Sequence, residues 1–391
     1  MKILVVCQYY HPEPFRIHEV CEALVQRGHS VTVLTGRPNY PMGEIPKEYL
    51  GKEHMDEVVN GVHIVRVKET PRSPGKVGLA RNYASYMMRG CMKALFMRKD
   101  YDVVFVYQLS PILMAIPAFV VRHFSRCKKI ALYCLDLWPE SLCSLGISTD
   151  SAFYKVIRRL SINIYNKVDA LGYTSRMFRS YFEDNLKLRQ QNYLHIPQFA
   201  DDLFTGVESE DHEGMNFVFA GNIGNMQSVG TIVRAASYCT RDDVKWHIVG
   251  DGFDLEECMR LAKELKVEDR VIFYGRRPVE DMPGFYSIAD AMIVTLADNA
   301  MISYTLPGKI QSYMAAGKAV LACANGEIDY VVNDAKCGIC VPAENAKALA
   351  EAAMSLTKES CERYGRAARL YYDRNYSKDE HIEGIVKLLE M

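Results

Sequence analysis

Glycines and cations gather just after short apolar runs in the second half of the chain. Gly221, Asn222, Ile223 and Gly224 follow the run Phe217–Ala220, while Gly250 and the pair Arg276-Arg277 follow the next two runs. Glycine lets a backbone turn sharply and approach a ligand closely, and free amides and guanidinium groups attract anions. Together these groups favour a phosphate-bearing ligand, although each turn alone is as typical of a loop without a ligand and each arginine alone of a solvated charge.

A second set of candidates surrounds a predicted helix that begins near Pro307. Leu306 and Pro307 lead into this helix, and proline suits its first turn. Lys309 places an ammonium group near the helix start, where a diphosphate would be attracted. Glu327 follows the apolar run Ala319–Ala322. Five predicted strand ends of one sheet therefore carry groups suited to a nucleoside diphosphate, with neither a Walker A loop nor a GxGxxG motif.

The first half offers weaker candidates for a second substrate. Asp136 follows the predicted strand Lys129–Cys134 and is expected to contact a ligand at that strand end. The alternative is that Asp136 caps the next helix. His11 and Arg16 lie in the loop after the first predicted strand and are weaker candidate ligand-binding residues. His11 could equally be a solvated loop residue.

The elements that must position these residues alternate between strand and helix along the whole chain. β-Branched apolar runs separated by helical patterns predict parallel sheets with right-handed crossovers. We expect two α/β domains with Rossmann-like parallel sheets facing across a cleft, over residues 1–203 and 213–375, and a polar linker over 204–214. A last helix over 376–391 is expected to return to the first domain. Predicted strands are Ile3–Val6, Val31–Thr35, Val62–Val67, Val103–Tyr107, Lys129–Cys134, Ala170–Thr174, Leu194–Ile196, Phe217–Ala220, Trp246–Val249, Val271–Tyr274, Ala291–Val294 and Ala319–Ala322.

Charge is divided unevenly along the 391 residues. The net charge is −1, but residues 1–200 hold 27 Lys and Arg against 17 Asp and Glu, and the remainder holds 20 against 31. Residues 72–99 contain seven Lys and Arg, no acidic residue, and interleaved tyrosines and methionines. Such a segment favours peripheral contact with an anionic membrane, or else a core-packed helix with a solvated basic face. Nucleic acid is disfavoured because no known binding motif accompanies the charge.

The location is expected to be the cytoplasm, at the inner face of the plasma membrane. The N-terminus lacks the pattern of a signal peptide, and no run of 18 apolar residues occurs. Twelve cysteines in so long a chain do not predict a disulfide framework.

At this point the motifs, taken in order, resemble a known family. FAGNIGNMQSV, HIVGDG, VIFYGRRPVEDMPGFYSIADAMIV, LPGKIQSYMAAGKAVLA and NGEIDYVV, with YYHPEPFRIHEV and LDLWPESL in the first half, resemble the retaining glycosyltransferases of family 4. These enzymes have the GT-B architecture. The resemblance extends in particular to the N-acetyl-L-fucosaminyltransferase-like subgroup of bacterial surface-polysaccharide enzymes.

The resemblance implies transfer of a sugar, such as an N-acetylated amino or deoxy sugar, from a UDP-linked donor to a sugar or polyprenyl-diphosphate acceptor. It implies retention of configuration and neither a metal nor a cofactor. Gly221–Gly224 would lie against the diphosphate, and Lys309 and Arg276 would supply positive charge. The backbone near Arg277 would meet the base, and Glu327 would hydrogen-bond the ribose or the donor sugar. Asp136 would contact the acceptor or the donor sugar, and His11 and Arg16 would be acceptor-binding residues.

Several positions depart from the family pattern. Asn222 and Gln227 stand where many members carry an Arg and a Lys in the donor site, and Tyr304 and Ser312 stand where the wider family has two glutamates. Pro12 to Phe15 replace a glycine-rich turn. Two alternatives therefore stay open: a sugar-nucleotide 2-epimerase, and a non-catalytic protein that binds a sugar nucleotide.

Overall fold

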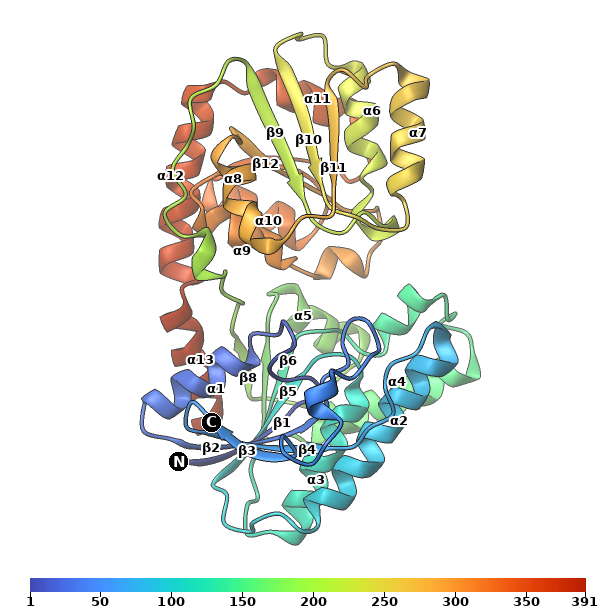
Figure 1. Ribbon diagram of the computed structural model, residues 1–391, viewed down its shortest axis with the longest axis vertical. Coiled ribbons are helices and arrows are strands. Elements are labelled where there is room, and N and C mark those ends of the chain that lie inside the picture. Colours follow the sequence, from blue (N-terminus) through green and yellow to red (C-terminus); the bar gives the residue numbers. More distant parts are fainter. The chain divides into compact units, whose positions relative to one another are not determined.

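The chain forms two compact units, each built around its own sheet. The computed structural model describes residues 1–391 apart from the side chain of Ser144. The first unit comprises residues 1–174, 178–196 and 382–391, and the second comprises 175–177 and 197–381. Figure 1 shows both sheets with helices around them. Residues 382–391 of the last helix belong to the first unit, and the second unit begins at Pro197, ahead of the predicted start at residue 213.

The first unit has an eight-stranded sheet in the order β3-β4-β2-β1-β5-β6-β7-β8. Neighbouring strands are parallel except for β3, which pairs antiparallel with β4. The short edge strand β3 was not predicted. The strands are β1 (Lys2–Val6), β2 (Ser30–Gly36), β3 (Asp56–Val59), β4 (Val62–Val67), β5 (Val103–Gln108), β6 (Ile130–Cys134), β7 (Ala170–Tyr173) and β8 (Tyr193–His195). The helices are α1 (Ile17–Gln26), α2 (Gly75–Ala94), α3 (Ile116–Phe124) and α4 (Ala152–Lys167). Two more, α5 (Met177–Ser180) and α13 (Lys378–Glu390), begin with residues of the second unit and continue with residues of the first.

The second unit has a six-stranded, fully parallel sheet in the order β11-β10-β9-β12-β13-β14. Its strands are β9 (Met215–Ala220), β10 (Val244–Val249), β11 (Val271–Gly275), β12 (Ala291–Thr295), β13 (Ala319–Cys323) and β14 (Gly338–Val341). Its helices are α6 (Gly230–Tyr238), α7 (Leu255–Leu265), α8 (Met282–Ser287), α9 (Gly308–Ala315), α10 (Glu327–Ala335), α11 (Ala346–Ser355) and α12 (Lys358–Asn375). Because all strands run one way, their carboxyl ends share one edge, where ligands of such sheets bind.

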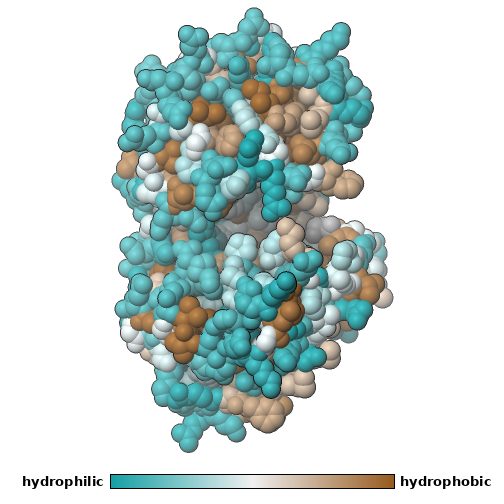
Figure 2. All heavy atoms as spheres, in the orientation of Figure 1, coloured by the Kyte–Doolittle hydropathy of each residue, from teal (hydrophilic) through white to brown (hydrophobic). Residues whose placement is uncertain are grey.

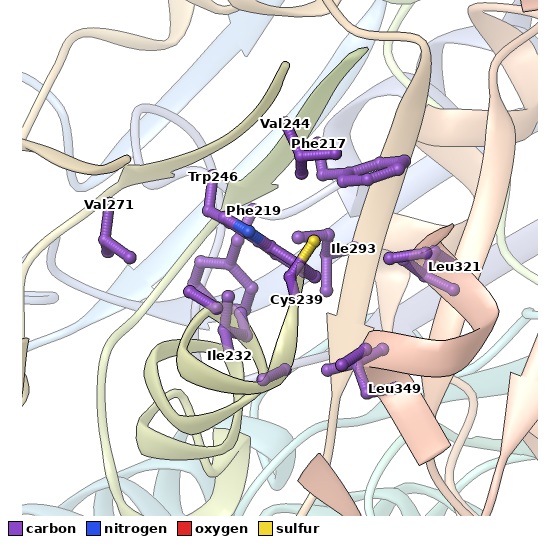
Figure 3. Close-up of a cluster of buried hydrophobic side chains, with 14 of the residues drawn as sticks. Phe217, Phe219, Ile232, Cys239, Val244, Trp246, Val271, Ile293, Leu321 and Leu349 are labelled. Atoms are coloured by element: carbon purple, nitrogen blue, oxygen red, sulfur yellow. The ribbon is translucent and has the colours of Figure 1, made fainter. Parts of the chain in front are cut away.

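Alternating side chains of β9 supply two separate cores. Phe217 and Phe219 point into one cluster with Trp246 and residues of α6, α7 and α11 (Figure 3). Val218 lies in the other cluster with residues of α8, α9, α10 and α12. Both faces of the sheet are therefore covered by helices, as buried parallel strands require.

The predicted linker packs onto the second unit instead of standing apart from it. Phe204 stacks on Tyr286 with ring centroids 5.0 Å apart and is buried in the core. The buried ammonium of Lys318 donates to Ser209 Oγ at 2.7 Å. The polar, acidic and glycine-containing composition suggested a linker, but an aromatic contact and several hydrogen bonds hold the segment against the second unit.

Candidate active site

A cavity of about 460 Å³ lies at the carboxyl ends of β9, β10 and β11 in the second unit. Strand ends that were predicted from separate stretches of sequence meet there. Its lining includes five of the predicted donor-site residues, namely Gly221, Asn222, Gly250, Arg276 and Arg277, together with Val249, Asp251, Gly252, Val279 and Met282.

The glycines of this cavity are required by close backbone contact. Gly250 has φ +147°, and a methyl group there would lie 1.8 Å from the carbonyl oxygen of Gly221. Gly252 has φ +157°, and a methyl group there would lie 2.3 Å from the oxygen of Ile223. The turns after β9 and β10 are thus pressed together, which only glycine allows.

Half of the amides in the Gly221–Gly224 turn are already used by the protein. The N–H groups of Gly221 and Ile223 donate to Val249 O and Asp251 O, each at 2.9 Å. Among the hydrogen bonds of the described residues, the N–H groups of Asn222 and Gly224 have no acceptor. Only the amides of Asn222 and Gly224 are therefore available to a diphosphate, because the other two donate to carbonyl oxygens at the end of β10 and just after it.

Lys309 lies beside this turn with a buried ammonium group. It is the second residue of α9, and its Nζ lies 4.0 Å from the centroid of the Phe219 ring. A methyl group on Gly221 would lie 2.7 Å from that Nζ. In the described part of the chain Nζ has no hydrogen-bond partner, and burial lowers the pKa of Lys309 to about 8. A desolvated cation without a counter-ion is costly, so the site is ready to accept an anion.

The two adjacent arginines at the end of β11 remain exposed. Within the described residues neither Arg276 nor Arg277 forms an ion pair, and both line the cavity. Just before them, the Tyr274 hydroxyl forms a hydrogen bond with His247 Nδ1 at 2.8 Å. Burial lowers the pKa of His247 to about 4. A neutral, buried histidine thus supports the strand end that carries the two guanidinium groups.

The departing positions Asn222, Gln227 and Ser312, and the predicted donor-site residues Leu306 and Pro307, have neutral side chains. Asn222 Nδ2 donates to Gln227 Oε1 at 3.2 Å. Leu306 is buried in the core, and Pro307 is the extended residue before α9. Ser312 Oγ donates to Gly308 O at 3.4 Å within α9. None of these described side chains is charged, so Arg276 and Arg277 are the cations that line the cavity, and Lys309 adds a buried ammonium beside the Gly221 turn.

Glu327 has a structural use that the sequence did not reveal. It begins α10 and is 1% exposed. Its two carboxylate oxygens accept from the backbone N–H groups of Arg176 at 3.1 Å and Met177 at 3.0 Å. A hydrogen-bonded carboxylate so deeply buried has little left for a ribose, so the predicted donor contact has no support from this geometry and stays a prediction.

Asp136 in the first unit also spends its carboxylate on neighbours. Its Oδ1 accepts from Ser141 Oγ at 2.6 Å, and its Oδ2 accepts from Ser110 Oγ. Ser110 in turn accepts from Trp138 Nε1 at 3.0 Å. Burial raises the pKa of Asp136. The alternative of a helix cap is wrong in detail, since hydroxyls and not backbone amides are bound, but the structural use is clear.

The acceptor candidates lie at the start of α1. Arg16 is the residue before α1, and its guanidinium contacts Glu19 Oε1 at 3.1 Å. His11 is exposed, and its ring centroid lies 5.8 Å from that of His18. The sequence reasoning missed three buried residues nearby, Glu13, Asn39 and Glu69, although the Pro12–Phe15 departure marked the same loop.

The basic segment 72–99 forms helix α2 and has two contrasting faces. Leu79, Tyr83 and Tyr86 are buried, and Tyr86 Oη donates to Cys7 O at 2.9 Å. Met88 and Met92 are more than half exposed. The tyrosines of the segment therefore pack inside, as the alternative of a core-packed helix expects, while these two methionines remain at the surface. Figure 2 shows hydrophobic surface residues among hydrophilic ones on one face.

Comparison with known proteins assigns the fold and the class. Residues 15–197 match the family described as "Glycosyl transferase 4-like domain", and residues 205–371 match "Glycosyl transferases group 1". Over 100% of both chains the structure is similar to HepE of Anabaena solved with UDP, with a TM-score of 0.73 and 14% identity. It is also similar to sucrose-phosphate synthase of Thermosynechococcus elongatus, with a TM-score of 0.77 and 15% identity over 100% of this chain and 98% of the other.

Two relatives extend the similarity at the level of sequence. The probable glycosyltransferase WbjE of Pseudomonas aeruginosa is 24% identical over 320 residues, which is 78% of each chain. The putative colanic acid biosynthesis glycosyl transferase WcaI of Escherichia coli K12 is 20% identical over 410 positions and 99% of each chain. The two parallel-sheet units thus form a GT-B fold. The chain belongs to the GT-B glycosyltransferases, with a 4-like domain followed by a group 1 domain.

Among the described residues no group of three or more His, Cys, Asp or Glu is placed to hold a metal ion. No helix of the described residues combines the length and the apolar character needed to cross a bilayer.

Proposed function

We propose that this protein transfers a sugar from a UDP-linked donor to a sugar or polyprenyl-diphosphate-linked acceptor, with retention and without a metal. The observation that carries the proposal is the buried, unpartnered ammonium of Lys309 next to the Gly221 turn. The free amide of Asn222 and the exposed Arg276 belong to residues that line a 460 Å³ cavity, and the ammonium of Lys309 lies beside Gly221 of the same lining. A diphosphate has the charge and size that such a place accepts.

The chemistry needs little more than charge stabilisation. The bond from the anomeric carbon to the phosphate oxygen breaks, and its electron pair stays on the leaving diphosphate. The acceptor oxygen bonds to the anomeric carbon from the same face, and its proton passes to the leaving phosphate oxygen. Lys309 and Arg276 would stabilise the charge that develops. In comparable sites, removal of one such donor lowers the rate by a factor of about 10² to 10³.

The relatives favour this donor and a role in surface polysaccharide synthesis. HepE was solved with UDP, and the name of WcaI refers to colanic acid biosynthesis. The finer membership in the N-acetyl-L-fucosaminyltransferase-like subgroup, and hence an N-acetylated amino or deoxy sugar, remains our proposal from the sequence motifs.

Thermal unfolding in a panel of UDP-, GDP- and dTDP-sugars tests the donor. A bound ligand raises the melting temperature by mass action, so UDP-sugars should give the largest rise. The variant Arg276→Gln should reduce that rise, whereas Arg374→Gln, an exposed arginine of α12, should not. A melting temperature that no sugar nucleotide of the panel raises would refute the donor assignment.

Incubation of the UDP-sugar without acceptor, followed by NMR, separates the competing activities. We expect slow release of UDP and no new sugar nucleotide. Appearance of a C2 epimer would identify an epimerase, and binding without any turnover, even with acceptors, would identify a non-catalytic protein.

We further propose that α2 brings the enzyme to the inner face of the plasma membrane. The arginine side chains of its outer face stand next to exposed apolar side chains: Met88 is 55% exposed, Met92 is 54% exposed, and Phe96 beyond the helix end is 85% exposed. Anionic bilayers bind surfaces of this kind. Sedimentation with vesicles containing phosphatidylglycerol should be strong, and should be lost in Arg81→Gln/Arg89→Gln but kept in Arg363→Gln/Arg366→Gln. Unchanged binding in the α2 variant would refute the contact.

A further inference from the structure

A buried carboxylate in the first unit joins two loops at the carboxyl edge of its sheet. Glu13 lies in the loop after β1 and is 4% exposed. Its Oε1 accepts from the N–H groups of Asn39 at 2.9 Å and Tyr40 at 2.8 Å, both in the loop after β2. Its Oε2 accepts from Tyr10 N–H at 3.1 Å. One side chain therefore satisfies three backbone amides that no regular secondary structure serves.

Asn39 carries this connection to a third loop. Its Nδ2 donates to Glu69 Oε1 at 2.5 Å, and its Oδ1 accepts from Arg72 N–H at 3.0 Å. Glu69 and Arg72 belong to the segment after β4. Asn82 of α2 completes the arrangement, because it accepts from Gln8 Nε2 at 2.8 Å. The loops after β1, β2 and β4 are thus held by one continuous buried network.

The surface that this network supports has a defined chemistry. The rings of Tyr9, Phe15 and Tyr40 contact one another, with centroids 5.0–5.6 Å apart. The Arg72 guanidinium lies 5.4 Å from the centroid of Tyr40. Phe15, Tyr40 and Arg72 are only partly buried. An aromatic face beside a cation suits a sugar ring that carries a negative group nearby.

We propose that Glu13 is a positioning residue, which fixes the loop after β1 against the loop after β2 so that Tyr40 and Arg72 can bind an anionic glycan acceptor. The identification of the bound glycan as an acceptor rests on the proposed transferase function. The joining of the loops by Glu13 does not depend on that function. A carboxylate is needed here because no other side chain offers two oxygens that accept without donating.

Protonation gives the role a pH signature. Burial raises the pKa of Glu13 to about 7, opposed by the three amide hydrogen bonds. The charged and titratable groups that face it are Arg66, Glu69, Cys7, Tyr9 and Tyr49. A neutral Glu13 has one oxygen that donates, so at least one of the three amides loses its acceptor as the pH falls through about 7.

Hydrogen exchange of the whole protein tests the joining of the loops. Because glutamine keeps only one accepting oxygen, at least one of the amides of Tyr10, Asn39 and Tyr40 should exchange tenfold or more faster in Glu13→Gln than in the wild type at pH 8. Glu44→Gln makes the same charge change on an exposed residue of the loop after β2 and should leave these amides unchanged. Wild-type protection of the three amides in Glu13→Gln would overturn the proposal, whatever the enzyme transfers.

Steady-state kinetics test the acceptor role, with N-acetylglucosaminyl diphosphate on a short prenyl chain as the probe. Glu13→Gln should raise the acceptor KM at least tenfold at pH 8 and leave the dissociation constant of UDP unchanged. The wild-type acceptor KM should rise as the pH falls below 7, and Glu13→Gln should remove this dependence. An unchanged acceptor KM overturns the positioning role of Glu13. A wild-type protein that does not bind UDP would instead refute the proposed function.

Discussion

The carboxyl edges of the two sheets use charge in opposite ways. In the second unit the ammonium of Lys309 and the guanidinium groups of Arg276 and Arg277 have no carboxylate partner among the described residues. In the first unit the carboxylates of Glu13, Glu69 and Asp136 are buried and hydrogen-bonded to neighbours. One edge leaves cations for a ligand, and the other uses anions to shape its own loops.

The difference matches what the two proposed substrates would demand. A diphosphate is recognised by charge and by close backbone approach, so glycines and unpaired cations are sufficient. An acceptor is recognised by the shape of a surface, and loops from different strands must be held in register to provide it. The same sheet geometry therefore supports two solutions, and their energetic signatures should differ on mutation.

The largest effect is expected for Lys309→Met. Removal of this buried, unpaired cation should lower kcat about 10²- to 10³-fold, by analogy with the loss of a single charge-stabilising donor. The free energy of unfolding should rise, because a desolvated ammonium without a counter-ion is replaced by an apolar chain of similar length. Turnover and thermal unfolding measure the two changes.

Lys347→Met on the exposed side of α11 is the matched control, and neither kcat nor stability should change appreciably there. If Lys309→Met keeps wild-type kcat, or if it unfolds more easily than the wild type, the second edge does not hold an unpaired cation for a ligand. The contrast between the two sheet edges then fails.

The next largest effect is expected for Gly250→Ala. The new methyl group would meet Gly221 O at 1.8 Å on a backbone with φ +147°, so the turns after β9 and β10 must separate. We expect a loss of about 2 kcal/mol in stability and a rise of roughly tenfold in the UDP dissociation constant, or about 1.4 kcal/mol. Gly284→Ala in α8, where a methyl group meets nothing within 4 Å, should instead stabilise slightly.

These glycines also show what the sequence could reveal. Gly221, Gly250, Arg276 and Arg277 directly follow strands that local apolar runs made visible, so their meeting at one edge could be predicted. Strand β4 has the predicted bounds for the same reason. The strands β3 and β14 were missed because short, partly exposed edge strands have little apolar signal.

The first edge was harder to predict because its residues act through distant partners. Glu13, Asn39 and Glu69 are each about 30 residues apart, and nothing local marks them as one network. Glu327 and Asp136 were assigned to substrates since they follow strands, but only packing shows that amides and hydroxyls already occupy their oxygens. Burial of the Lys309 ammonium likewise depends on where Phe219 and Gly221 lie.

A pH titration sharpens the comparison at the second edge. The pKa of Lys309 is lowered to about 8 by burial, so its ammonium is lost as the pH rises above 8. UDP affinity should then fall by up to tenfold per pH unit, and isothermal titration should show no such fall in Lys309→Met. Stability should move the opposite way, because the unfolded chain binds the proton up to pH 10.5 and folding is therefore favoured as the pH rises from 8 to 10.5. Parallel pH slopes in the wild type and the variant would assign the titration to another group.

The smallest effect is expected for Asp136→Asn, and it decides whether the first edge contributes chemistry or only shape. Asparagine keeps one oxygen for Ser110 or Ser141 and loses the charge, so kcat should fall less than tenfold and stability by about 1–2 kcal/mol. The double variant with Ser110→Ala should cost less than the sum of the single changes, because both remove the same hydrogen bond. A loss of 10²-fold or more in kcat with unchanged stability would mean that Asp136 acts on a substrate. The first edge would then resemble the second in keeping a charged group for catalysis.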